Sequence, residues 1–460
     1  MKNFFYLTIV ILLGFCQFLT AQTISPFKEN DRVVFLGNSI TDAGHYHSYI
    51  WLYYMTRFPN MRLTIFNSGI GGDTAENMYN RLDGDVFNKR PTVIVTTFGM
   101  NDTGYSEYNQ SGAEDFAYRR VKESREWFSK IEERYKKLPN TNIILMGSSP
   151  YDETAKISNN PFKNKNKAML SIIDFQRKSA QENRWQFIDL NEPMTSINEQ
   201  MQKSNPSFTL CGEDRIHPDN DGHMVMAYLF LRAQGFVGKE VAVMEIDASK
   251  TSVKSSTNCN ISNLKKTSTG ISFDYLAEAL PYPLDTIARG WGQKRCQAKA
   301  LEIVPFMQEM NREILQVSGL KGMYRLLIDE EEIGIWSDED FSKGINLAAL
   351  TNAPQYQQAL AMMYLNEERW EIERRFRDYI WVQYMFFRDM GLLFADNREA
   401  IKVMNENLNK NGWLRARHDL YSKAMFPEIR EIWINEMKLL VEKIYEINKP
   451  LKRKYSLIKQ

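Results

Sequence analysis

The chain has 460 residues and a mass of 53.8 kDa, about three times the size of a common single domain, which predicts more than one domain. Hydrophobic residues make up 43% and charged residues 25%, close to the globular average, and this excludes collagen, coiled coil and wholesale disorder. A formal net charge of +1 gives no electrostatic reason to expect nucleic acid as a partner.

The first 21 residues have the pattern of a secretory signal peptide. Lys2 supplies a positive charge, residues 4–13 form a short apolar run, and Thr20 and Ala21 offer a small-residue cleavage site. We therefore expect an exported protein, periplasmic or extracellular. Cys16 could carry a lipid anchor, but Phe15 stands where a small residue is needed, so we expect none. No later stretch reaches the roughly 18 apolar residues of a membrane span.

Residues 28–238 show the alternation of an α/β domain. Short apolar runs rich in branched residues are bounded by turn residues and separated by amphipathic helical stretches, such as 48–57 and 113–137. Continuous apolar strands of this kind predict a parallel sheet covered by helices on both faces. We expect a doubly wound five-strand sheet with its site at the carboxyl ends of the strands. The predicted strands are 33–36, 63–66, 93–96, 143–146 and 187–190.

The pattern changes after this domain. Residues 239–348 are predicted to be a small strand-rich segment, in which 315–317 and 324–328 form a strand pair around a turn. Residues 349–460 are predicted to be a helical region. Within it, residues 367–377 alternate acids and bases, which is typical of a solvated face. The apolar run 379–387 needs a cover, which we expect to be the α/β domain, the strand-rich segment or a second copy of the chain.

Small polar residues follow three of the predicted strands. Ser39 comes after the first, Gly71 and Gly72 after the second, and Asn101 after the third. Taken singly, each is an ordinary turn or helix-capping residue. Together they predict one crevice, because the carboxyl ends of parallel strands meet at one edge of the sheet. The glycines let the backbone approach a ligand, and the asparagine amide can donate to developing negative charge.

Asp214 and His217 lie three residues apart in a turn before the last helix of the domain. A carboxylate at this spacing can accept a hydrogen bond from Nδ1 of the ring and so direct Nε2 toward a nucleophile. A lone histidine is more often structural. With an aspartate beside it and a candidate serine elsewhere, we interpret this pair as catalytic.

These four blocks together resemble the SGNH (GDSL-type) hydrolase family, whose fold is flavodoxin-like. The resemblance covers about residues 31–238 in block order, spacing and strand-end placement. It implies a nucleophile at Ser39, a His217–Asp214 pair, and oxyanion donors at Ser39, Gly72 and Asn101. Asn38 departs from the family motif, which has aspartate there, and Gly71 is the alternative to Gly72 as donor.

The resemblance implies acyl transfer to water through a serine ester, with no cofactor and no metal. Stretches in residues 280–348 resemble the extension of exported bacterial SGNH proteins, which suggests that the substrate is an acylated, in particular acetylated, carbohydrate. The alternatives are a lipid or lysophospholipid acyl hydrolase and a non-catalytic glycan-binding relative. We expect a substrate pocket that includes Asn38, His45, His47, Gly71 and Met100.

The remaining cysteines and histidines predict no metal site. His45 and His47 have no evident third ligand, and Cys211, Cys259 and Cys296 lack CxxC or CxxH spacing. The three cysteines are not a disulfide framework, although one bridge would be possible in an oxidising compartment.

Overall fold

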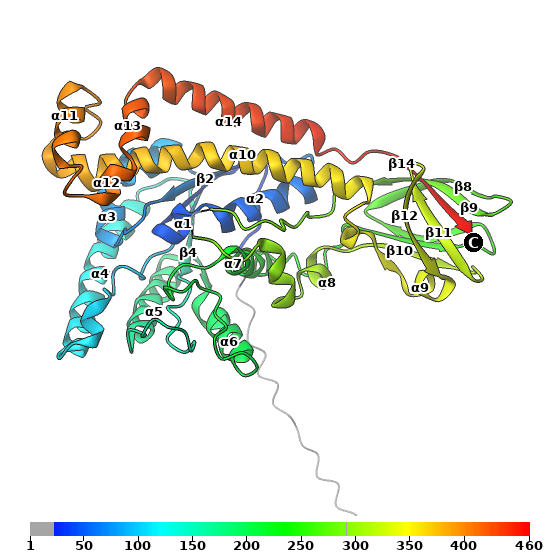
Figure 1. Ribbon diagram of the computed structural model, residues 1–460, viewed down its shortest axis with the longest axis horizontal. Helices are drawn as coiled ribbons and strands as arrows, with labels where there is room; N and C mark the ends of the chain where they lie inside the picture. Colours follow the sequence, from blue (N-terminus) through cyan, green and yellow to red (C-terminus); the bar gives the residue numbers. More distant parts are fainter. Residues whose placement is uncertain (1–22, 291) are drawn as a thin grey trace, which may run out of the picture.

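The computed structural model describes residues 23–290 and 292–460, so the predicted signal peptide (residues 1–21) lies outside the described residues. The described chain forms three parts (Figure 1): an α/β domain, a strand-rich region at one end, and a layer of helices that lies over the α/β domain. Long helices run from the strand-rich end across the α/β domain, and the C-terminus lies at the strand-rich end.

The α/β domain is built on one five-strand parallel sheet in the order β2-β1-β3-β4-β5, which confirms the predicted fold. Each strand overlaps the apolar run predicted for it. Their bounds are β1 (Arg32–Gly37), β2 (Thr64–Gly69), β3 (Val93–Thr96), β4 (Asn142–Gly147) and β5 (Gln186–Asp189).

Helices cover both faces of this sheet. They are α1 (Ser39–Asp42), α2 (His45–Arg57), α3 (Ala75–Asn80), α4 (Ala113–Tyr135), α5 (Lys165–Asn183), α6 (Asn191–Gln202) and α7 (Asn220–Ala233). Val33 and Phe35 of β1 pack in one core with α2 and α7, while Val34 and Leu36 pack in the other with α3 and α4. Burial on both faces explains why the strands are continuously apolar rather than alternating.

The strand-rich region consists of two sheets, β13-β10-β6-β7 and β12-β11-β14-β9-β8, whose apolar residues share one core. Its strands are β6 (Ala242–Asp247), β7 (Ser252–Thr257), β8 (Cys259–Lys266), β9 (Gly270–Ala277), β10 (Glu313–Ser318), β11 (Met323–Ile328), β12 (Glu331–Ser337), β13 (Ile345–Asn346) and β14 (Arg453–Lys459). Short helices α8 (Phe306–Met310) and α9 (Asp338–Lys343) flank β10 to β12.

Two predictions for this region were wrong. The strands at 315–317 and 324–328 do not pair with each other, because the turn between them carries the chain from one sheet to the other. The last residues of the chain are not helical: β14 lies between β11 and β9. The alternation that buries Tyr455 and Leu457 on one face of β14 spans only a few residues, and it follows a long charged helix.

The helical layer consists of α10 (Pro354–Val382), α11 (Arg398–Asn407), α12 (Gly412–Ala416), α13 (His418–Ala424) and α14 (Pro427–Ile447). Helices α10 and α14 lie side by side (Figure 1). The apolar run 379–387 is covered largely from within the layer, since Tyr379, Val382 and Phe387 share a core with Tyr421 and Trp433. In the described part of the chain, no helix is both long and apolar enough to cross a bilayer.

Residues 367–377 of α10 form the predicted solvated face only in part, since Glu368 and Glu371 are exposed. Arg369, Glu373 and Arg377 are buried. Arg369 pairs with Glu373 at 2.9 Å, and Arg377 pairs with Asp85 of the α/β domain at 2.7 Å. The buried charges of this segment therefore have partners on α10 itself and in the α/β domain, while the exposed ones face water.

Candidate active site

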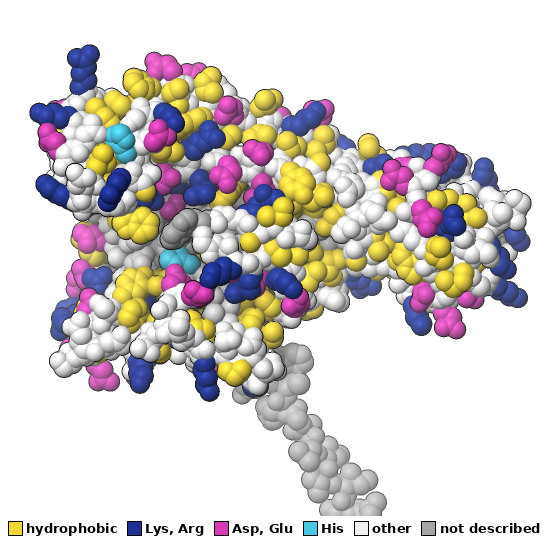
Figure 2. Space-filling view, in the orientation of Figure 1, with side chains coloured by type: hydrophobic (Ala, Val, Ile, Leu, Met, Phe, Trp, Pro, Cys, Tyr) yellow, Lys and Arg dark blue, Asp and Glu magenta, His cyan; other side chains and the backbone are white. Residues whose placement is uncertain are grey.

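A cavity of about 880 Å³ lies at the carboxyl ends of the parallel strands. Its lining comes from the α/β domain, from Gly290 and residues 292–295, and from the helical layer. Figure 2 shows the molecule hollowed between the helical layer and the α/β domain, with a histidine side chain visible there. The lining includes all five residues predicted to be catalytic, namely Ser39, Gly72, Asn101, Asp214 and His217.

Ser39 is the first residue of α1, directly beyond the end of β1. Asn38 caps this helix, because its Oδ1 accepts a hydrogen bond from the backbone N–H of Ile40 at 3.1 Å. An aspartate could accept the same bond, so the departure of Asn38 from the family motif preserves the local structure. The strand end and the cap together fix the serine at the cavity.

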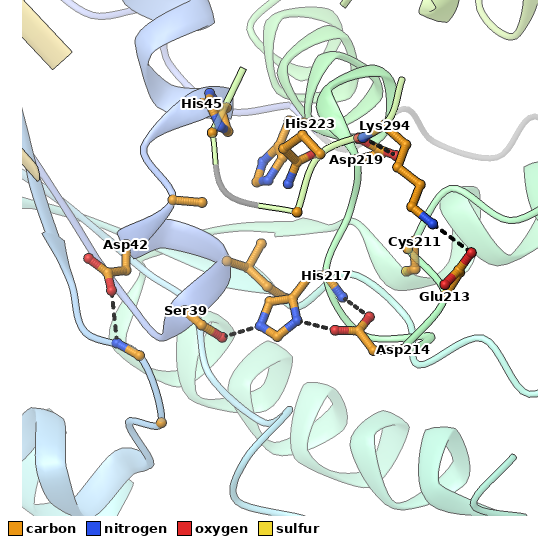
Figure 3. A pocket seen from close by; sticks show the side chains of 18 of the residues that line it. Ser39, Asp42, His45, Cys211, Glu213, Asp214, His217, Asp219, His223 and Lys294 are labelled. Carbon is orange, nitrogen blue, oxygen red and sulfur yellow. Dashed lines mark hydrogen bonds and ion pairs between the residues drawn. The ribbon is translucent and has the colours of Figure 1, made fainter. Parts of the chain in front are cut away.

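His217 lies between Ser39 and Asp214 (Figure 3). Its Nε2 is 2.7 Å from Ser39 Oγ, and its Nδ1 is 2.5 Å from Asp214 Oδ2. Asp214 Oδ1 also accepts the backbone N–H groups of Ile216 and His217, at 2.9 and 3.0 Å. Burial alone would raise the pKa of Asp214, but these hydrogen bonds and the imidazole lower the pKa below its usual value. The carboxylate therefore stays charged and orients the ring.

Arg215 holds this turn in place and was missed by the sequence analysis. It is buried, with φ +65°, and its guanidinium donates to the carbonyls of Asp152 and Ala155 at 3.0 and 2.9 Å. A buried cation satisfied by backbone carbonyls anchors the loop that presents Asp214 and His217. The sequence carries no signal for this role, since a charged residue in a turn is ordinarily exposed.

The loop after β2 offers one free N–H at the cavity. The N–H of Gly71 donates to Asp42 Oδ2 at 3.1 Å, whereas the N–H of Gly72 donates to no residue within the described ranges 23–290 and 292–460. Gly72 has φ +91°, a conformation that residues with a Cβ rarely adopt. This geometry favours Gly72 over Gly71 as a donor to an oxyanion.

Asn101 presents a side-chain amide to the cavity. Its Nδ2 donates one hydrogen bond to the carbonyl of Asp73 at 2.9 Å, and its Oδ1 accepts from the hydroxyl of Tyr105, which leaves the second N–H of the amide available. Beneath this turn, Lys165 donates to the carbonyls of Met100 and Gly104, both at 2.6 Å. Burial lowers the pKa of Lys165 to about 7.

The predicted pocket residues separate into two groups. His45 and Gly71 line the cavity. Asn38, His47 and Met100 are buried and do not line it, which corrects that prediction. The Asn38 side chain caps α1, and the His47 ring, on α2, stacks on Phe35 of β1 in the core. Burial lowers the pKa of His45 to about 3 and that of His47 to about 4, so both rings are neutral.

One wall of the cavity comes from the helical layer and was not foreseen from the sequence. It contains Trp370, Arg374, Asp378, Trp381, Met385, Trp413 and Arg417. The Arg417 guanidinium lies 4.4 Å from the ring centroid of Trp381 and 5.7 Å from that of Trp413, and it pairs with Asp378 at 2.8 Å. Trp413 is 64% exposed. The cavity is thus aromatic on the side facing away from the sheet.

In residues 23–290 and 292–460, no group of three or more His, Cys, Asp or Glu side chains is arranged to hold a metal ion. Cys211, Cys259 and Cys296 are free thiols.

Comparison with known proteins finds family matches for two separate parts of the chain. Residues 35–225 match the GDSL-like lipase/acylhydrolase family, and residues 360–449 match the diltiazem deacetylase C-terminal helical domain. A solved structure of a gut microbial diltiazem-metabolizing enzyme is 62% identical, with a TM-score of 0.94, covering 96% of this chain and all of that one. An acetylxylan esterase of Geobacillus stearothermophilus is 24% identical over 226 residues, 45% of this chain and 94% of its own length.

The chain belongs to the GDSL-like lipase/acylhydrolase (SGNH) family, as the sequence motifs predicted. It is an ester hydrolase. The helical layer matches a domain family of its own, whereas the sequence pattern predicted only a helical region there.

Proposed function

We propose that the protein is a serine esterase in which Ser39 attacks an ester carbonyl, His217 acts as general base and acid, and Asp214 orients the imidazole. The observation that supports this most directly is the continuous hydrogen-bonded line from Ser39 Oγ through His217 to Asp214 at the cavity. His217 takes the serine proton as the acyl-enzyme forms and returns it to the leaving alcohol. Water then releases the acid by the same steps in reverse.

The tetrahedral intermediate needs donors for its oxyanion. We assign this role to the N–H groups of Ser39 and Gly72 and to the free N–H of the Asn101 amide. All three residues line the cavity, and the Gly72 N–H is not committed to another residue of the described chain. Donors fixed before the reaction stabilise developing charge at little reorganisation cost.

The proposed substrate is the acetyl ester of a ring-bearing alcohol, with an acetylated carbohydrate as the natural class. An acetylxylan esterase is similar over the α/β domain, and the tryptophans of the cavity wall offer flat faces to a ring. A second candidate is an aromatic acetate such as diltiazem, favoured by the 62% identity to a diltiazem-metabolizing enzyme. Acetate release from acetylated xylo-oligosaccharides and from diltiazem would rank the two.

The alternative substrate is a lipid ester with a long acyl chain in place of the acetyl group. A series of nitrophenyl esters from acetate upward separates the two proposals. We expect activity to fall as the acyl chain lengthens. A preference for chains of about eight carbons or more would contradict deacetylation and favour the lipid acyl hydrolase.

The mechanism itself is tested by Ser39→Ala together with a fluorophosphonate probe, which labels activated serines covalently. We expect the wild type to be labelled, and the variant neither labelled nor active. The variant should keep the wild-type circular dichroism, because removing one hydroxyl at a cavity leaves the core unchanged. Retained turnover in Ser39→Ala would overturn Ser39 as the nucleophile. A wild type that is neither labelled nor active would instead favour the non-catalytic, glycan-binding alternative.

We also propose export to the periplasm or the outside of the cell, on the pattern of residues 1–21 alone. Fractionation of cells and N-terminal sequencing of the mature chain test it. A mature chain that begins near Gln22, recovered outside the cytoplasm, is the expected result. A lipid-modified N-terminus at Cys16 would contradict this expectation and show that the mature chain is anchored to a membrane.

A further inference from the structure

The carboxylate of Asp42 joins helix α1, which begins with Ser39, to the loop after β2 that carries Gly71 and Gly72. Asp42 is the last residue of α1, the short helix that begins with Ser39. Its Oδ2 accepts the N–H of Gly71 at 3.1 Å, as the dashed line in Figure 3 marks. Its backbone carbonyl accepts from Nδ2 of Asn67, whose Oδ1 accepts the N–H of Gly69 at 2.8 Å. The loop is therefore tied to α1 at two points.

The same loop is held on its other side by helix α10. Arg377 donates to the carbonyls of Gly69 and Asn67, at 2.9 and 3.1 Å, and Glu373 accepts the N–H of Asn67 at 3.0 Å. Ile70, just before the glycines, is fully buried in the core of the helical layer. Up to Ile70 the loop is thus fixed by several contacts. Beyond it, two hydrogen bonds flank Gly72: the Gly71 N–H donates to Asp42 at 3.1 Å, and the Asp73 N–H donates to the Ile70 carbonyl at 3.2 Å.

We propose that Asp42 is a positioning residue for catalysis: its carboxylate fixes the Gly71–Gly72 peptide so that the N–H of Gly72 points to the oxyanion. This inference rests on the proposed function, in which Gly72 is an oxyanion donor. Asp42 does not touch the reacting atoms. It acts through the loop, which α10 anchors from the opposite side.

The physical reason is the freedom of the two glycines. A Gly-Gly segment has many accessible backbone conformations, and Gly72 is held in one with φ +91°. The Asp73 N–H to Ile70 carbonyl bond closes the turn around this peptide. Without an acceptor for the Gly71 N–H, the peptide that carries the Gly72 N–H can still change its tilt within that turn. A donor misplaced by about 1 Å can cost roughly 10²-fold in rate. Asp42 also lines the cavity, but its replacement leaves the other lining residues in place, so KM should change little.

The test uses two replacements of the same shape. Asp42→Leu removes the acceptor, and Asp42→Asn removes the charge but keeps an oxygen that can accept the Gly71 N–H. We expect kcat on nitrophenyl acetate to fall about 10²-fold in Asp42→Leu with KM close to wild type. In Asp42→Asn we expect kcat within about threefold of wild type, because a neutral acceptor keeps a weaker form of the bond.

A second readout separates positioning from a general loss of structure. Phenylboronic acid forms a tetrahedral adduct on the active serine, so it reports on the oxyanion site without turnover. Its inhibition constant should rise at least about tenfold in Asp42→Leu and hardly at all in Asp42→Asn. Asp83→Asn is the control: this side chain is 75% exposed and pairs with Arg134 on the surface.

The outcomes distinguish this inference from the proposed function. If Ser39→Ala abolishes activity while Asp42→Leu keeps wild-type kcat and boronate affinity, the positioning role is wrong and the serine mechanism stands. Equal losses in Asp42→Asn and Asp42→Leu would also overturn the acceptor role. If Asp42→Leu does not fold, Asp42→Ala gives the same two readouts. Retained activity in Ser39→Ala would instead remove the premise.

Discussion

The α/β domain and the helical layer use charged residues in different ways. In the α/β domain, three of the residues proposed to be catalytic, Ser39, Gly72 and Asn101, follow strand ends, and their spacing in the sequence reflects their place in the fold. In the helical layer, the alternating charges along α10 predict a solvated face, but Arg369, Glu373 and Arg377 are buried. Arg377 contacts Asp85, Asn67 and Gly69 of the α/β domain. The difference shows that alternating charges on a helix predict exposure to water only where no neighbouring part of the fold supplies partners for those charges.

A second difference concerns what each region contributes to the cavity. The α/β domain provides the serine, histidine, aspartate and oxyanion donors, whereas the helical layer provides tryptophans, arginines and Met385. Trp370 also ties the two regions directly, because its indole N–H donates to the carbonyl of Ala43 at 2.9 Å, beside Gly44 at φ +82°. The groups proposed for the chemistry and the tryptophans proposed to contact the substrate thus come from different parts of the chain.

If the α/β domain carries the catalytic groups, Asn101→Ala should lower kcat strongly and leave KM nearly unchanged. Losing one side-chain donor to the oxyanion is expected to lower kcat by about 10²–10³-fold, or roughly 3–4 kcal/mol of transition-state stabilisation. Steady-state kinetics on nitrophenyl acetate measure it, with urea unfolding as the check on stability. A kcat within threefold of wild type would remove Asn101 from the oxyanion site.

If the helical layer is structurally part of the catalytic unit, Arg377→Leu should destabilise the protein. It leaves the Asp85 carboxylate short of one partner and two carbonyls without their donor. We expect a loss of about 3 kcal/mol in the free energy of unfolding, because breaking a buried ion pair leaves a charge uncompensated. Lys402→Gln, on an exposed face of α11, should change it by less than about 0.5 kcal/mol. Equal stability of the two variants would show that the layer is only loosely attached.

The far end of α10 allows a test by pH. Glu313 in β10 is buried and accepts hydrogen bonds from Tyr275 and from Gln355 of α10. Burial raises its pKa to about 7, from 4.5. The folded state therefore holds a proton that the unfolded state releases, so this group's contribution to stability is full at low pH and is lost as pH rises through 7.

Between pH 5 and pH 8 the loss from Glu313 should be about 2.5 kcal/mol. Glu313→Gln cannot ionise, so its stability relative to wild type should rise by that amount over the same range. Urea unfolding of both proteins at the two pH values measures the difference. A pH-independent difference would mean that Glu313 is solvated and that the junction is open to water.

The smallest effect on kinetics is expected from the tryptophans that the helical layer contributes to the cavity. Trp413→Ala should raise KM for a ring-bearing acetate by about fivefold, roughly 1 kcal/mol, and leave kcat unchanged, because the ring contacts the alcohol and not the reacting carbonyl. Leu439→Ala is the control, since Leu439 is 70% exposed on α14 and does not line the cavity. An unchanged KM would assign substrate contact to the α/β side instead.

Local patterns determined much of this protein. Five apolar runs specified a parallel sheet, because each run is short and buried on both faces. That sheet brought Ser39, Gly72 and Asn101 to one edge, since parallel strands end there together. The spacing of Asp214 and His217 placed the carboxylate beside the ring within a single turn.

Tertiary structure alone decided the rest. The aromatic wall, the buried Arg215 and Arg377, and the strand β14 depend on partners that are distant in sequence, in some cases by hundreds of residues. A short local pattern cannot report such partners: a buried arginine and an exposed one look the same in the sequence, and they differ only in whether carbonyls and carboxylates elsewhere in the fold satisfy the charge.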